Sequence, residues 1–182
     1  ILETRYRNVN INIDRNIIQL PHLSNEFDGI IGYISKHKKK ISKNIKITST
    51  TINKDYVANN AILYDNYESG FSTIDENAFI CFDFGDSFII PKSYTIRSWN
   101  SRPGCSHPRG WVIEGSNDNN EFEILDEQRD CSLLNGKALV CTFNINNSQN
   151  KKYQYIRMRS IMPDWHGTNK LDINSIDFNG AF

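Results

Sequence analysis

Short stretches of alternating apolar and polar residues, interrupted by turn-forming residues, constrain the fold of this chain most strongly. Residues 94–98 (YTIRS) alternate, residues 110–115 (GWVIEG) resume the alternation, and residues 122–125 (FEIL) follow a run of Ser, Asn and Asp. Successive side chains of a β-strand point to opposite faces, so a period of two indicates a strand with one buried face. Strands joined by such polar turns are typical of an antiparallel sheet.

The same pattern recurs along most of the chain. It predicts strands at residues 45–52, 80–84, 92–98, 110–115, 122–125, 139–145, 153–160 and 171–178. About eight short strands without a long helix are typical of an all-β sandwich or jelly roll. We therefore expect one β domain, which is also what 182 residues allow.

The alternation also predicts which side chains are buried. Ile80, Phe82 and Phe84 share one face of a strand, and Ile156 and Met158 share one face of another. We expect both sets to lie in the core, because a period of two places alternate residues on the same side of a sheet.

Arginines are expected on the outer faces of these strands. Arg97, Arg157 and Arg159 could line a groove, or they could form solvated ion pairs across the sheet with Asp83 or Glu114. An exposed pair of this kind contributes less than about 1 kcal/mol.

Two local features predict irregular geometry. In residues 171–178 (LDINSIDF) the apolar positions change parity between Ile173 and Ile176, as they would at a β-bulge. The pair Asn135 and Gly136 could form a two-residue hairpin turn. That turn would place Cys131 opposite Val140.

The four cysteines, Cys81, Cys105, Cys131 and Cys141, fit no metal-ligand spacing. Two disulfides are possible in principle, but such a hairpin would put Cys131 out of register with Cys141. Buried free thiols in a reducing compartment are the preferred interpretation.

Composition excludes several classes of protein. The 21 basic residues balance 21 acidic ones, and a dedicated nucleic-acid binder needs a basic face. A hydrophobic content of 38% is enough for a packed core. The apolar runs are much shorter than a membrane span needs, and no secretory signal opens the sequence.

Residues 1–40 are expected to be an N-terminal extension or a linker from a preceding domain, and residues 41–182 the β domain. Residues 1–23 could form an edge strand or the tail of that preceding domain, and Ser24 with Phe27 makes an incomplete capping box for a helix. The chain begins with Ile1, which suggests a piece of a longer polypeptide or a processed one. The basic run at residues 36–46 could be a localisation signal or a contact for an acidic partner, but a solvated linker is the simpler interpretation.

Several motifs together resemble a known family. They are ICFDFGD (80–86), IPKSYTIRS (90–98), WVIEGSNDNNEFEILDE (111–127), YQYIRMRS (153–160) and PDWHGTNKLDINSIDFNG (163–180). This order is similar to the discoidin domain, or coagulation-factor C-type domain, of the galactose-binding-like superfamily. The resemblance covers residues 45–182 and implies an eight-stranded jelly-roll β-sandwich.

The segment HPRGWVIEGSND looks closer to the intracellular branch found behind BTB/POZ domains in protist proteins than to secreted lectins. Residues 27–33 (FDGIIGY) are similar to the lead-in of that branch. Secreted members join their two ends by a disulfide, and this chain has no terminal Cys for one. The resemblance therefore implies a cytoplasmic protein, which could be associated with the cytoskeleton.

Ligands of the resembled family bind to loops at one end of the barrel. By that resemblance residues 63–76, 99–109 and 161–170 should converge there, with Phe71 in the first loop. The side chains expected to bind a ligand are Tyr64, Asp65, Tyr67, Arg102, His107, Arg109, Trp165 and His166. Aromatic rings with Arg suit either a sugar ring or a protein hot spot.

Some of these side chains have an alternative structural role. His107 could hydrogen-bond a ligand or cap its own loop, because a neutral imidazole both donates and accepts. Trp165 could touch a ligand, although packing under the barrel end is preferred, and Trp111 is expected to be buried.

Metal binding and catalysis receive less support. Asp65, Asn66 and Asp75 lie where some members of the family hold calcium, so calcium is possible, but the dense carboxylate spacing of a calcium loop is absent. No catalytic motif is present, and Ser106 beside His107 does not make a nucleophile and base.

Three functions remain open at this point. The preferred one is an intracellular, non-catalytic adaptor domain that binds a protein partner through the three loops, within a larger chain or assembly. The second is a carbohydrate- or lipid-binding lectin domain. The third is a structural component of a cytoskeletal assembly.

Overall fold

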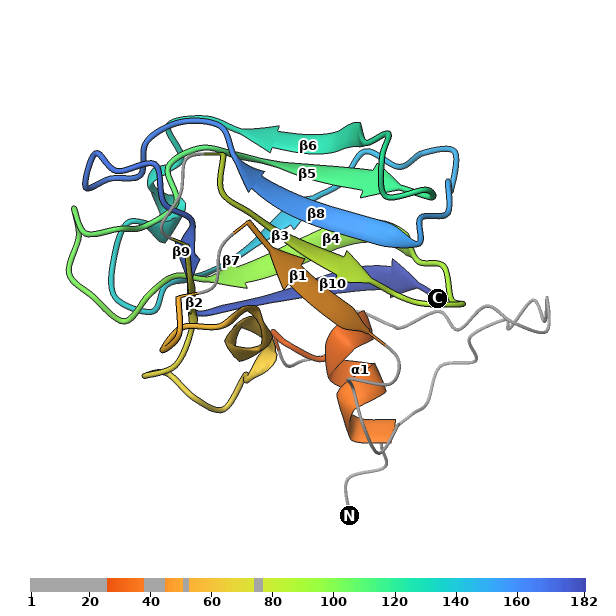
Figure 1. Ribbon diagram of the computed structural model, residues 1–182, viewed down its shortest axis with the longest axis horizontal. Helices are drawn as coiled ribbons and strands as arrows, with labels where there is room; N and C mark the ends of the chain where they lie inside the picture. The colour runs from red at the N-terminus through yellow and green to blue at the C-terminus, as the bar shows by residue number, and fades with distance from the viewer. Residues whose placement is uncertain (1–25, 38–44, 51–52, 74–76) are drawn as a thin grey trace, which may run out of the picture.

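Two antiparallel sheets face each other in the computed structural model, which describes residues 26–37, 45–50, 53–73 and 77–182 (Figure 1). The larger sheet has the strand order β1 (Lys46–Ser49), β3 (Phe79–Asp83), β8 (Tyr155–Ser160), β5 (Trp111–Ser116) and β6 (Glu123–Gln128). The smaller sheet has the order β10 (Ser175–Ala181), β4 (Ile90–Arg97) and β7 (Val140–Asn144). Within the described residues these eight strands confirm the predicted all-β jelly-roll sandwich.

Shorter elements close the ends of the sandwich. Two-residue strands β2 (Phe71–Ser72) and β9 (Asp172–Ile173) pair with each other beside the loop end, on the left in Figure 1. The helical elements are α1 (Ile30–His37) and the 3-10 helices η2 (Ala58–Ile62) and η3 (Ser132–Leu134). The strand orders show that the chain crosses between the two sheets repeatedly. Consecutive strands are therefore often not neighbours in a sheet.

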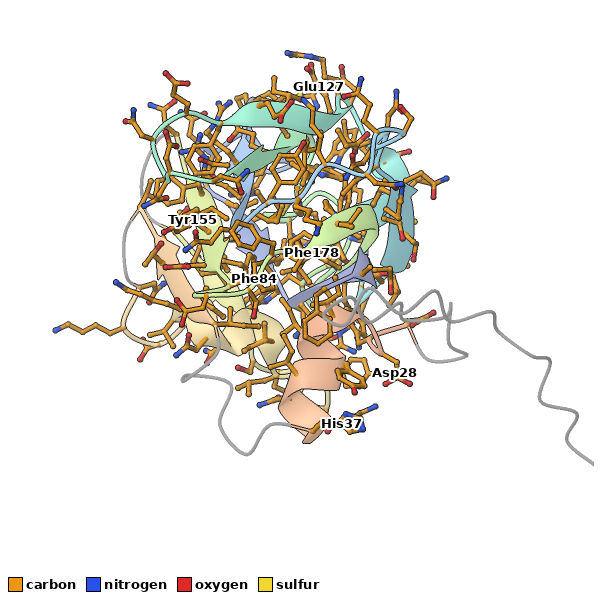
Figure 2. All side chains as sticks on the ribbon, turned by 90° about the vertical axis from the view of Figure 1, so that its right-hand side faces the viewer. Asp28, His37, Phe84, Glu127, Tyr155 and Phe178 are labelled. Atoms are coloured by element: carbon orange, nitrogen blue, oxygen red, sulfur yellow. The ribbon has the colours of Figure 1, made fainter. Side chains whose placement is uncertain are left out.

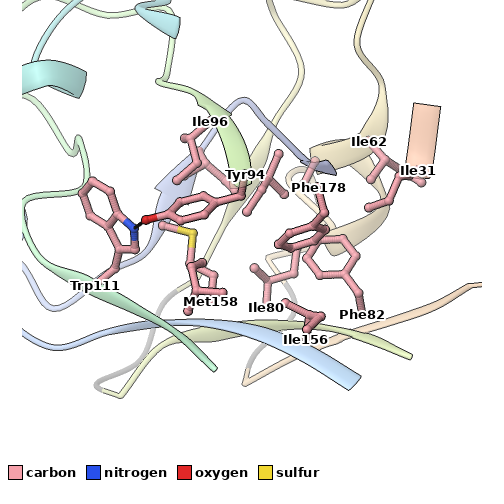
Figure 3. Packing of buried hydrophobic residues seen from close by; sticks show 14 of the residues in the cluster. Ile31, Ile62, Ile80, Phe82, Tyr94, Ile96, Trp111, Ile156, Met158 and Phe178 are labelled. Carbon is pink, nitrogen blue, oxygen red and sulfur yellow. Dashed lines mark hydrogen bonds between the residues drawn. The ribbon is translucent and has the colours of Figure 1, made fainter. Parts of the chain in front are cut away.

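The core lies between the two sheets, and Figure 3 shows its packing. Phe82 of β3 meets Phe178 of β10 edge to face, with ring centroids 5.4 Å apart. Each such buried side chain contributes about 1.5–3 kcal/mol by leaving water. The predictions for residues 80, 82, 84, 156 and 158 are confirmed, because all five side chains are at most 2% exposed.

Trp111 is also buried, as predicted, and its one polar atom is satisfied. Its indole Nε1 donates a hydrogen bond of 2.9 Å to the hydroxyl oxygen of Tyr94. The Tyr94 hydroxyl in turn donates to Asp126 over 2.6 Å. This chain of hydrogen bonds lets two large amphipathic rings fill the core without leaving a polar group unpaired.

Helix α1 is docked on the sandwich by a buried carboxylate. Asp177 of β10 accepts hydrogen bonds from the backbone N–H groups of Gly29, Ile31 and Gly32 over 2.9–3.1 Å. These groups lie at the helix N-terminus, where backbone donors have no partner within the helix. The carboxylate thus performs the capping role that the sequence assigns to Ser24, which lies outside the described residues.

The helix is part of the same core, although it lies within the segment expected to be an extension. Ile30, Ile31 and Ile34 are at most 2% exposed and belong to the buried cluster. Figure 2 shows Phe84 and Phe178 inside the sandwich, whereas Asp28, which precedes α1, and His37, at the end of α1, lie at the periphery. Of the basic run at 36–46, residues 38–44 fall outside the described residues, as do residues 1–25 of the expected extension.

The predicted bulge between Ile173 and Ile176 is wrong. The chain instead leaves β9 at Ile173, passes through Asn174 and starts β10 at Ser175. Both isoleucines are fully buried because they belong to strands of different sheets. The irregularity in the pairing of β10 with β4 lies further along, between Asn179 and Gly180.

The possible hairpin turn at Asn135 and Gly136 does not form. Residues 132–134 form η3, and β7 pairs with β4 rather than with the segment before the turn. The four cysteines are unpaired; Cys81 and Cys131 are buried, and Cys105 and Cys141 are half-buried.

The arginines differ from each other in environment. Arg157 and Arg159 both bond to Glu114 over 2.7 Å, which confirms Glu114 as the predicted partner, but the Glu114 side chain is only 4% exposed. This triad is therefore partly buried rather than solvated. The prediction for Arg97 is wrong, because that residue is 3% exposed and bonds to Asn174 Oδ1.

Candidate functional site

A cavity of about 350 Å³ opens at the end of the sandwich where the loops meet. We call it the rim pocket. Its charged and aromatic lining side chains are Tyr56, Trp99, Lys170 and Asp172. Its remaining lining residues are Asn53, Ser72, Ser101, Cys105 and Ser106. All three loops expected from the family resemblance contribute to this lining, so they converge as expected.

The short β2–β9 ladder positions one wall of the rim pocket. Ser72 stands directly opposite Asp172 in that antiparallel pair, so their side chains lie on the same face. Burial raises the pKa of Asp172 to about 6, although the hydroxyls of Ser72 and Ser106 and the charge of Lys170 oppose this. Asp172 Oδ1 is buried without a hydrogen-bond partner in the described part of the chain.

An aromatic pair forms another part of the lining. The rings of Tyr56 and Trp99 meet edge to face, with centroids 4.9 Å apart and planes at 78°. Gly70 lies behind the indole, and a Cβ added there would come within 2.5 Å of the Trp99 ring. The glycine therefore allows Trp99 to sit against the ladder, at the edge of the rim pocket.

His107 stabilises the loop of residues 99–109 through hydrogen bonds to the loop's own backbone. It is fully buried, and its Nε2 lies 3.2 Å from the carbonyl oxygen of Ser101 and 3.1 Å from that of Arg102. Because carbonyl oxygens only accept, Nε2 carries the proton and donates. The expectation that the loop presents this side chain outward is wrong, and the loop-capping alternative is the one observed.

Trp165 and Arg109 are tied to neighbouring segments. The Trp165 indole donates to the carbonyl oxygen of Cys131 over 3.2 Å. The Arg109 guanidinium lies over the Trp165 ring at 5.1 Å and pairs with Asp130. Both side chains brace the loop of residues 161–170 against the loop before η3, outside the rim pocket.

The loop that carries Tyr64 and Tyr67 is folded around Arg97 and Asn174. Arg97 Nη2 donates to the carbonyl oxygen of Tyr64 over 2.6 Å, and the guanidinium lies 4.2 Å from the Tyr67 ring centre. The Tyr64 hydroxyl donates to the carbonyl oxygen of Ile176, and burial raises its pKa. These tyrosines support the loop from outside the rim pocket.

The calcium expectation falls on this loop. The carbonyl oxygens of Asn66, Tyr67 and Ser69 accept hydrogen bonds from Asn174 Nδ2. Within the described residues no group of three His, Cys, Asp or Glu side chains could hold a metal ion. Asp75 lies outside the described residues.

None of the eight side chains chosen from the sequence lines the rim pocket. Asp65, Arg102 and His166 are exposed, and the other five have the contacts described above. Sequence reasoning missed Tyr56, Trp99, Lys170 and Asp172. Trp99 and Lys170 begin and end two of the expected loops, so attention to loop boundaries would have found them, whereas the β2–β9 ladder left no signal.

A second concavity, of about 440 Å³, lies at the far end of β5. Its polar groups are already used within the fold. Glu123 bonds to Lys151 and Tyr153, and the Asp118 carboxylate accepts from the backbone N–H groups of Asn120 and Glu121, which lower the pKa of Asp118. The rim pocket is therefore the better candidate for a ligand site.

Comparisons with solved structures concern the whole sandwich. A CBM32 carbohydrate-binding module of Clostridium perfringens, in complex with GalNAc-β-1,3-galactose, is 16% identical at a TM-score of 0.58, over 75% of this chain and 96% of that one. The CBM32 of AlyQ, in complex with 4,5-unsaturated mannuronic acid, is 14% identical at a TM-score of 0.57, over 74% and 94%. The family 32 module of NanJ from C. perfringens, in complex with galactose, is 14% identical at a TM-score of 0.55, over 76% of this chain and 93% of that one.

This chain has the galactose-binding-like, discoidin-type fold. Identities this low establish the fold and not the ligand. No family model matches the sequence, and no curated protein matches it. No helix in the described ranges is long and apolar enough to cross a bilayer.

Proposed function

We propose that this chain is a non-catalytic carbohydrate-binding module that takes a saccharide in the rim pocket. The observation that carries the proposal is the lining itself, where the Tyr56–Trp99 pair stands beside Asp172, Lys170 and several hydroxyls. A saccharide offers an apolar ring face and many hydroxyls, so it needs an aromatic surface together with donors and acceptors. A cavity of about 350 Å³ is within the usual size of ligand sites.

The compared structures support this proposal. Three modules with the same fold were solved with saccharides, and each spans nearly its full length in the comparison. The carbohydrate-binding alternative is therefore preferred to the protein adaptor, which has no observation in its favour. A cytoplasmic location, a role in the cytoskeleton and an intracellular BTB/POZ-linked lineage stay predictions.

A glycan array tests the proposal directly, with wild type compared to Trp99→Ala and Phe88→Ala. Phe88 is a 46% exposed aromatic residue outside the rim pocket, so it is a matched control. We expect wild type and Phe88→Ala to bind the same glycans and Trp99→Ala to bind them at least about tenfold more weakly. A silent array for folded wild type, or equal binding by all three proteins, would contradict the proposal.

A further inference from the structure

Lys170 is the cation of the rim pocket. It is half-buried in the lining and forms no ion pair with any residue that the structure describes. Two arginines near this end are engaged elsewhere, since Arg109 pairs with Asp130 and Arg97 is buried against Asn174, and Arg102 is exposed outside the lining. A lysine held in a partly desolvated cavity without a direct ion pair favours an anionic ligand.

Asp172 is the acidic group beside it. The charged groups that act on Asp172 are Lys170 and Asp164, and the hydroxyls next to it belong to Ser72 and Ser106. The other titratable side chains of the lining are Tyr56 and Cys105, from the segment before η2 and the loop of residues 99–109. Asp164 is itself buried and bonded to Thr168 and the backbone of His166, so it stays within its own loop.

The protonation of Asp172 decides the charge of the rim pocket. Because burial raises its pKa to about 6, the carboxyl group is mostly ionised at pH 7.5 and mostly protonated at pH 5. The ionised form offsets the charge of Lys170 and repels a second carboxylate. The protonated form leaves Lys170 uncompensated and adds one O–H donor.

From this arrangement we infer that the rim pocket selects a saccharide bearing a carboxylate, which Lys170 binds and the protonated form of Asp172 admits. The inference rests on the proposed carbohydrate-binding function and names its ligand class. A sugar carboxylate has a pKa close to that of the α-carboxyl group of a peptide, about 3.5, so it stays ionised at pH 5. Affinity for such a ligand therefore increases as the pH falls from 7.5 to 5, while a neutral saccharide gains nothing from the positive charge.

The test uses two matched probes, a uronic-acid oligosaccharide and the same oligosaccharide with its carboxylates reduced to alcohols. Calorimetric titrations at pH 7.5 and pH 5 compare wild type with Lys170→Gln, Lys170→Arg and Asp172→Asn. Lys152→Gln serves as the control, because Lys152 is exposed and lies outside the rim pocket. Circular dichroism checks that each variant is folded.

Wild type is expected to bind the uronic-acid probe about tenfold more tightly than the reduced probe at pH 5. Lys170→Gln should abolish that preference, Lys170→Arg should retain it, and Asp172→Asn should remove the difference between the two pH values. Equal affinity for the two probes, or a preference that survives Lys170→Gln, would overturn the inference and leave the carbohydrate-binding function intact. If neither probe nor any glycan of the array is bound, the proposed function itself fails, and the inference with it.

Discussion

Arg97 Nε donates a hydrogen bond of 2.5 Å to Asn174 Oδ1, which connects the end of β4 to the break between β9 and β10. The same guanidinium reaches the carbonyl oxygen of Tyr64 and the hydroxyl of Ser175. Asn174 Nδ2 donates hydrogen bonds to the carbonyl oxygens of Asn66 and Tyr67, in the loop that carries Tyr64. Two side chains from distant parts of the chain therefore replace the regular hydrogen bonding that this loop lacks.

Replacing Arg97 by Met should destabilise the fold. The substitution leaves the Tyr64 carbonyl without its donor and removes one of the two donors to Asn174 Oδ1, the other being the Ser175 hydroxyl. We expect a loss of about 2–4 kcal/mol in the free energy of unfolding. Chemical denaturation measures it. The control is Arg129→Met, which removes an exposed ion pair with Glu127 and should cost less than about 1 kcal/mol. Equal losses for the two variants would show that Arg97 does not hold the loop.

Asp177 gives stability a pH dependence of defined sign. Burial raises its pKa to about 6 in the folded chain, although the backbone N–H groups of Ile31, Phe178, Gly32 and Gly29 oppose the shift. An unfolded Asp titrates near 3.9, so the folded state holds the extra proton between these values. The contribution of this group is complete below about pH 4 and declines as the pH rises through about 6, by about 3 kcal/mol in total.

Comparison with Asp177→Asn isolates that contribution, because the amide does not titrate. The destabilisation caused by Asn should be larger at pH 4 than at pH 7. Denaturant titrations across this range measure the difference, and hydrogen exchange of the Ile31 and Gly32 amides reports on α1 itself. A destabilisation that stays constant from pH 4 to pH 7 would contradict the buried-cap interpretation.

The triad of Glu114 with Arg157 and Arg159 should show the opposite pH dependence. Burial raises the pKa of Glu114, but hydrogen bonds from Arg159 and Arg157 outweigh it and lower the pKa below its usual value. Its contribution is therefore present above pH 5 and is lost as the pH falls through the lowered pKa. Glu114→Gln should cost about 2–3 kcal/mol at pH 7, against less than about 1 kcal/mol for the exposed Glu127→Gln. Chemical denaturation at pH 7 measures the loss of unfolding free energy in each variant. Similar losses for Glu114→Gln and Glu127→Gln would count against a partly buried triad.

Gly70 tests how closely the aromatic wall must sit against β9. An alanine Cβ there would lie 2.5 Å from the Trp99 ring and 2.7 Å from the carbonyl oxygen of Ile173. We expect Gly70→Ala to lose about 1–3 kcal/mol of stability and to weaken saccharide binding. Gly104→Ala is the comparison, since its Cβ would meet nothing within 4 Å and only its positive φ of 79° adds a cost of about 1 kcal/mol. Binding and denaturation curves for the two variants should therefore separate, and unchanged binding by Gly70→Ala would refute the close fit.

The sequence predicted the sandwich because alternation reports burial directly. Phe82 and Met158 lie in the core for the reason given by their spacing. The docking of α1 could not be predicted in this way, because Gly29 and its acceptor Asp177 are 148 residues apart and neither belongs to a local capping motif. Tertiary partners of this kind have no periodic signal.

The loops of the site were predictable and its side chains were not. The choice of His107 and Trp165 rested on residue type, yet both donate to backbone carbonyls and use their polar atoms within the fold. In the sequence, Asp172 cannot be distinguished from any other polar residue of a strand. Only the pairing with Ser72 in the structure places it at the rim pocket. Whether a polar side chain is hydrogen-bonded within the fold or available to a ligand depends on tertiary contacts. The amino-acid composition of a loop does not predict these contacts.

Mapping a bound saccharide onto the chain by NMR tests the central claim most directly. Titration of the labelled protein with the strongest ligand of the glycan array should shift the Trp99 indole N–H and the backbone amides around Ser72, Ser106 and Asp172 in a saturable manner. Amides beside the concavity at the far end of β5, near Asp118, should stay in place. Saturable shifts at Asp118 with none at Trp99 would contradict the assignment of the rim pocket as the binding site.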